Sequence, residues 1–125
     1  MDKYFYKKEI KIPLYEGKFI IILSNDVDNL KKYIPKFERT EIYASTWLLD
    51  WRERRGIAII LNFDNSLDKI RNGTITHEAI HFSHFVAEEA GFEPSFSNDE
   101  PIAYLAGWAT DNIYKFMDKH NKKAN

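Results

Sequence analysis

Apolar stretches of strand length alternate with short polar breaks in the first half of the chain. Residues 4–14 are rich in β-forming side chains, and Gly17 separates them from a second apolar stretch at 18–24, so the pair predicts a hairpin. Residues 57–63 give the clearest strand pattern in the chain. Residues 40–51 also indicate a strand, although their Trp-Leu-Leu portion fits a helix nearly as well.

The rest of the apolar pattern follows the helical period. Asp26 or Asp28 is suited to cap a short helix after the hairpin. A first long helix is predicted at 74–90, with apolar positions on one side and histidines on the other, and Gly91 is suited to end it. A second long helix is predicted at 98–119.

This order of elements predicts a single α+β domain over residues 1–125. The strands and the short helix occupy residues 1–70, and the two long helices would cover a small mixed or antiparallel sheet. Hydrophobic residues make up 44% of the chain, which is enough to build one core and argues against disorder.

Charge and cysteine content narrow the classes of function. The net charge of −1 gives no electrostatic reason to expect nucleic acid or an anionic membrane as a partner. The longest aliphatic run, at 19–23, is too short to span a bilayer, and no secretory signal is recognisable, so we expect a cytoplasmic protein. The chain has no cysteine, so a metal site would need nitrogen and oxygen ligands.

The candidate chemistry lies on the first long helix, in the run His77-Glu78-x-x-His81. Helical residues four apart lie on one face, so His77 and His81 can bind one ion, and zinc is the metal expected for this motif. Glu78 is placed to reach a metal-bound water. The alternative interpretation is an amphipathic helix with a polar histidine face. Mn²⁺, Co²⁺ and Ni²⁺ also suit such ligands.

Glu100 is the predicted third ligand. His84 is seven residues from His77, about 10.5 Å along the helix, which is too far for comfortable binding of the same ion. The loop after the first long helix is long enough to bring Glu100 back to the histidine pair. A competing explanation is a capping box, in which Ser97 caps the second helix and Glu100 folds back on it.

Two segments carry a family resemblance. The run H-E-A-I-H followed by N-D-E-P-I-A-Y-L resembles the glutamate-ligand zincin metallopeptidases, or gluzincins. Residues 76–108, about a quarter of the chain, resemble small zincin-like proteins of phages and prophages. The resemblance implies that His77, His81 and Glu100 bind zinc and that Glu78 is the catalytic general base. It also implies an edge strand that holds an extended substrate, for which residues 57–63 are the candidate.

The chain departs from the family pattern at several positions. Tyr104 stands where some gluzincins have an aspartate, and it could orient a ligand, stabilise an oxyanion as a catalytic residue, or pack in the core. The metzincin pattern fails, because His84 and Ala87 occupy its glycine and third-histidine positions. Few residues follow Glu100, so any cleft would be shallow or completed by a partner protein.

Three functions remain open from the sequence. The leading hypothesis is a zinc-dependent hydrolase, and specifically a metallopeptidase acting on a peptide or protein. The second is a non-catalytic adaptor, for instance in phage assembly, in which zinc pins the two long helices together. The third is an α+β interaction module without metal.

Overall fold

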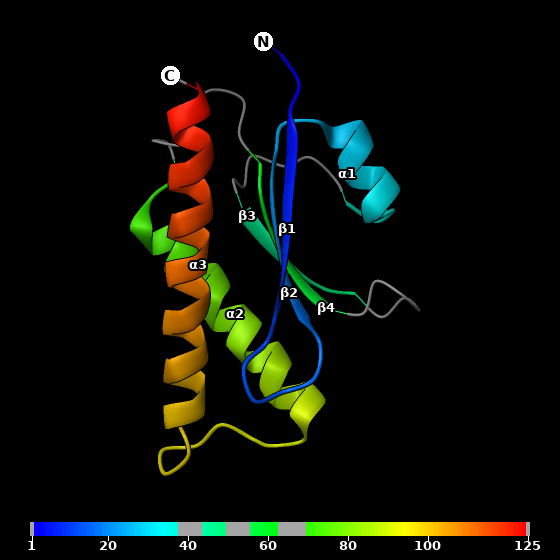
Figure 1. The fold of residues 1–125 in the computed structure, drawn as a ribbon. Helices are drawn as coiled ribbons and strands as arrows, with labels where there is room; N and C mark the ends of the chain where they lie inside the picture. Colours follow the sequence, from blue (N-terminus) through cyan, green and yellow to red (C-terminus); the bar gives the residue numbers. More distant parts are fainter. Residues whose placement is uncertain (1, 38–43, 50–55, 63–69, 125) are drawn as a thin grey trace.

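The computed structural model describes residues 2–37, 44–49, 56–62 and 70–124, with side chains described up to His120. In this part of the chain a four-stranded mixed sheet packs against three helices, which confirms the predicted α+β class (Figure 1). The elements in chain order are β1 (Phe5–Lys11), β2 (Lys18–Ser24), α1 (Val27–Tyr33), β3 (Ala44–Leu49), β4 (Gly56–Leu61), α2 (Asn72–Ala90) and α3 (Glu100–Ala124).

The strands lie in the order β1-β2-β4-β3. β1 and β2 form the predicted antiparallel hairpin, and Gly17 takes the positive φ of 105° that its turn requires. β2 pairs in parallel with β4, and β3 pairs with β4 in the antiparallel direction. The Trp-Leu-Leu segment is therefore strand, because pairing with β4 decides between two local tendencies that were nearly equal.

This order corrects the sequence-based choice of substrate-holding strand. β4, which covers most of the predicted 57–63 segment, lies between β2 and β3 and has both sides paired, while Phe63 is outside the described residues. β3 lies at the end of the described sheet instead. Strand order depends on pairing between distant segments, so local apolar pattern alone could not reveal which strand is at the edge.

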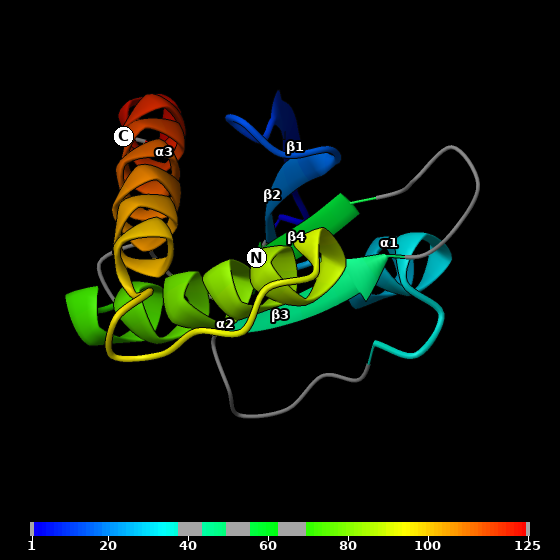
Figure 2. The same ribbon diagram turned by 90° about the horizontal axis from the view of Figure 1, so that it is seen from below.

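The central strands are buried on both faces because helices cover each side of the sheet. α2 and α3 cover one face, and α1 covers the other (Figure 2). Alternate side chains of β2 and β4 therefore enter two separate cores. The core under α2 and α3 contains Phe19, Ile21, Leu23, Ile57, Ile59, Leu61, Ile75, Phe82, Leu105 and Ile113, and the core under α1 contains Ile20, Ile22, Leu30, Ile34, Phe37, Ala58 and Ile60.

Two helix ends are fixed by capping residues that the sequence indicates. Asp26 caps α1, and its side chain accepts a hydrogen bond of 3.2 Å from the backbone N–H of Asn29. Gly91 ends α2 in the left-handed conformation, with φ of 82°, as predicted. No described helix is long and apolar enough to cross a membrane.

Substitution by alanine at two glycines is expected to change the free energy of unfolding in opposite directions. A Cβ atom on Gly56 would lie 2.7 Å from the backbone carbonyl oxygen of Lys18, its partner in the β2–β4 ladder. The exposed Gly107 lies inside α3, and nothing is within 4 Å of the place where its Cβ would be.

We expect Gly56→Ala to lower the free energy of unfolding by about 1–3 kcal/mol, because neither strand can move apart cheaply. Gly107→Ala should raise it by about 0.5–1 kcal/mol through better helix propensity. Urea unfolding followed by circular dichroism measures both values. If both substitutions changed the free energy of unfolding by the same amount and in the same direction, the backbones of β2 and β4 could not be tightly packed at Gly56.

Candidate metal centre

His77 and His81 lie one turn apart on the solvent-facing side of α2. Their Nε2 atoms are 3.1 Å apart and the rings meet edge to face. Two nitrogens bound to one tetrahedral zinc ion, at bonds of about 2.0–2.1 Å, would be about 3.3–3.4 Å apart. The observed separation is a few tenths of an ångström shorter than this, and the helical period places both rings on one face of α2.

Glu78 is buried, whereas the two imidazoles on the same helix are exposed. Only 6% of its surface is exposed, and its Oε2 atom has no hydrogen-bond partner in the described part of the chain. On the same turn, the hydroxyl of Thr46 in β3 donates a 3.2 Å hydrogen bond to the backbone carbonyl of Glu78. An unpartnered buried carboxylate oxygen is costly, and such groups in folded proteins often belong to a site that binds water or a ligand.

The environment of this carboxyl group changes its acidity. Burial raises the pKa of Glu78 above the ordinary glutamate value, because the charged form loses hydration. The nearby His77 and His81, and to a smaller extent the neighbouring hydroxyl of Thr46, act in the opposite direction and lower the pKa, but by less than burial raises it. A carboxyl whose pKa is raised holds a proton more readily than an ordinary glutamate, which favours a role in proton transfer.

These residues lie in an open hollow of about 850 Å³ between α2 and β3. Its other walls come from the segment after α1, the end of β4 and the start of α2. The sequence contains no sign that β3 contributes to this site, since nothing in its apolar pattern marks Thr46 as a neighbour of Glu78. The lining consists of Lys36, Phe37, Ala44, Ser45, Thr46, Trp47, Asn62, Gly73, Thr74, His77, Glu78, His81 and Phe85.

Glu100 does not join the histidine pair in this structure. No three His, Cys, Asp or Glu residues among those described are grouped so that they could hold a metal ion. α3 begins at the level where α2 ends and runs back along it (Figure 1). Trp108 of α3 stacks on Phe82, and Glu100 lies eight residues before Trp108, about 12 Å further along the helix axis.

Two further polar residues named from the sequence are exposed. Tyr104 is 56% exposed on α3, and His84 is exposed on α2 one turn beyond His81. Ser97 is not the N-cap of α3, so the predicted capping box between Ser97 and Glu100 does not form. Asp99 is the N-cap of α3, since its carbonyl accepts the N–H of Ala103 at 2.9 Å.

Comparisons with known protein families, curated proteins and solved structures found no match to this chain.

The raised pKa of Glu78 leads to a prediction about metal-free protein. Because its pKa is higher in the folded than in the unfolded state, the ionised carboxyl destabilises the fold. The contribution of Glu78 to stability should therefore be fully present below the ordinary value of 4.5 and should be lost as the pH rises through the raised pKa. Glu78→Gln removes this dependence, so its melting temperature should exceed that of the wild type by a margin that widens with pH.

Thermal unfolding in EDTA from pH 4.5 to 8 measures this margin. Glu88→Gln is the control, since Glu88 is an exposed glutamate of the same helix. A constant difference between Glu78→Gln and wild type across the range would contradict the burial effect.

Proposed function

We propose that this chain is a zinc-dependent hydrolase, and that its substrates are peptides or proteins. The observation that carries the proposal is the pairing of two convergent imidazole nitrogens with a buried, underbonded carboxyl group on the same helix, beside an open hollow. Each component has an ordinary explanation by itself, but the combination matches the needs of metal-assisted hydrolysis.

The chain's own residues have distinct roles in this proposal. His77 and His81 bind the metal through Nε2. Zinc, when bound, acts as a Lewis acid toward a carbonyl and makes a bound water more acidic. Glu78 takes a proton at its carboxylate and returns it to the leaving group, and its raised pKa favours this exchange. Thr46 fixes the backbone of Glu78 relative to β3.

The substrate class follows from the position of β3. No described strand pairs with the outer side of β3, so its backbone donors and acceptors can bind an extended chain. Its residues Ala44 to Trp47 line the same hollow as the histidines. A peptide paired with β3 would therefore pass the metal-binding pair, whereas a compact small molecule would make no use of this strand.

The proposed site has two protein ligands, His77 and His81, whereas the gluzincin arrangement adds a third, Glu100. Catalytic zinc sites ordinarily have three protein ligands, and Glu100 lies apart from the two imidazoles. The adaptor hypothesis needs a ligand from α3 to pin the two long helices together, so the position of Glu100 gives it no support. We therefore place the metal on α2 alone among the described helices.

Zinc titration tests the ligand assignment. We expect His77→Ala and His81→Ala each to weaken zinc binding by more than about a hundredfold, since loss of an outer partner of a ligand already costs about 10–100-fold. His84→Ala, the matched control on the same helix, should bind as the wild type does. Isothermal titration calorimetry after EDTA treatment measures all three affinities.

Glu100→Gln tests whether Glu100 binds zinc, as the family resemblance implies, or stays apart from the metal, as its position in the structure indicates. Because Glu100 lies apart from the pair, the substitution should leave zinc affinity within about twofold of the wild type. A loss as large as that of His77→Ala would instead restore Glu100 as the third ligand and require α3 to rearrange on metal binding.

Glu78→Gln tests catalysis separately from metal binding. The variant should keep zinc, because Glu78 is not a ligand, and should lose about 10²–10⁴-fold in hydrolysis, the usual contribution of a general base. Cleavage of casein and of random peptide pools by zinc-loaded protein is the measurement. Full activity in this variant would remove Glu78 from the mechanism.

A further inference from the structure

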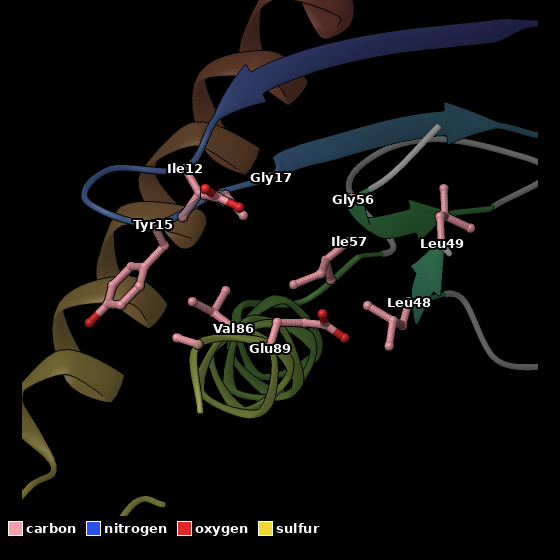
Figure 3. A pocket seen from close by; sticks show the side chains of 11 residues that line it. Ile12, Tyr15, Gly17, Leu48, Leu49, Gly56, Ile57, Val86 and Glu89 are labelled. Atoms are coloured by element: carbon pink, nitrogen blue, oxygen red, sulfur yellow. The ribbon is translucent and has the colours of Figure 1, made fainter. Parts of the chain in front are cut away.

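A second, smaller pocket lies at the other end of α2 (Figure 3). It holds about 280 Å³ and is bounded by the β1–β2 turn, the end of β3, the start of β4 and the last turns of α2. This volume is near the lower end of the range for small-molecule sites, so it suits one long side chain better than a whole cofactor. None of the residues assigned to the metal centre lines it.

The walls of this pocket combine apolar surface with two carboxylates. Ile12, Ile57 and Val86 form the buried part. Glu16 and Glu89 lie at its exposed rim, and Figure 3 shows Glu89 extending toward the space beside Ile57. Neither carboxylate takes part in an ion pair with a described residue. An apolar interior with acidic groups at the mouth is complementary to a lysine or arginine side chain, which has an apolar stem and a cationic end.

The pocket and the hollow of the metal centre are neighbours along the same two elements. β3 lines the hollow with Ala44 to Trp47 and the pocket with Leu48 and Leu49. α2 lines the hollow up to Phe85 and the pocket from Val86 onward. His81 and Glu89 are eight residues apart, about 12 Å along the helix axis, a distance that three to four residues of an extended peptide cover.

We propose that this pocket binds a lysine or arginine side chain of a peptide that lies extended along β3, three to four residues from the bond at the metal centre. The inference rests on the proposed function for the position of that bond, and it gives the substrate class as peptides with a basic residue at a fixed distance from the cleaved bond. The pocket itself, with its two carboxylates, would bind such a side chain whether or not metal is present.

Peptide binding and cleavage test the pocket separately from the metal. Four pools of blocked, fluorescein-labelled decapeptides carry Lys, Arg, norleucine or Glu at one fixed position, with the other positions random. Fluorescence anisotropy on metal-free protein should give about threefold to fivefold tighter binding of the Lys and Arg pools than of the norleucine pool, the range for partly exposed ion pairs. The Glu pool should bind most weakly.

Substitutions connect this preference to the pocket. Glu89→Gln and Glu16→Gln should each reduce the preference for Lys over norleucine and leave the affinity for the norleucine pool unchanged. Glu88→Gln, an exposed glutamate that does not line the pocket, should change neither value. Equal binding of the Lys and norleucine pools, or equal behaviour of Glu89→Gln and Glu88→Gln, would overturn the assignment.

Cleavage by zinc-loaded protein separates this inference from the proposed function. Mass spectrometry should place the cut three to four residues from the fixed Lys or Arg. Hydrolysis with no such spacing and no preference would overturn the pocket and leave the hydrolase standing. A binding preference that depends on Glu89, without hydrolysis of any pool, would support the pocket as a peptide-binding site and overturn the hydrolase.

Discussion

The parallel pairing of β2 with β4 is the constraint on which the rest of the fold depends. Both strands are apolar on both faces, so neither face of the sheet can be left to water. α1 must cover one side, and α2 must lie against the other with Phe82 in contact with Phe19 of β2. This packing fixes the rotation of α2, and the polar side of the helix consequently lies along β3.

The elements encoded by local pattern were predictable from the sequence. The Asp26 cap, the Gly91 stop and the His77–His81 spacing each depend on residues within a few positions of one another, and the hairpin joins two strands that follow each other in the sequence. The strand order and the surroundings of Glu78 depend on contacts between distant segments, which periodicity does not report. The third-ligand prediction for Glu100 required a particular path of the chain after α2, and loop length permits many paths.

Glu78 shows how burial and the histidine pair act together. One turn of α2 exposes two imidazoles and buries the carboxyl between them in sequence, because helical positions one apart face about 100° away from each other. Burial makes the charged carboxylate unfavourable, and the imidazoles offset part of that cost. The helical spacing places the two imidazoles on the exposed side of α2, and packing against other segments, β3 among them, buries the carboxyl of Glu78.

Among the described strands, β3 has a partner on one side only, and an unpaired strand edge has a cost for a free protein. Proteins commonly protect such strands with lysine or proline, but Ala44–Leu49 has the sequence ASTWLL and contains neither, nor any acidic residue. The same row of backbone groups that would accept a peptide is equally complementary to β3 of another molecule. Self-association at high protein concentration would then compete with peptide for the edge of β3, and a bound peptide would keep two molecules from pairing there.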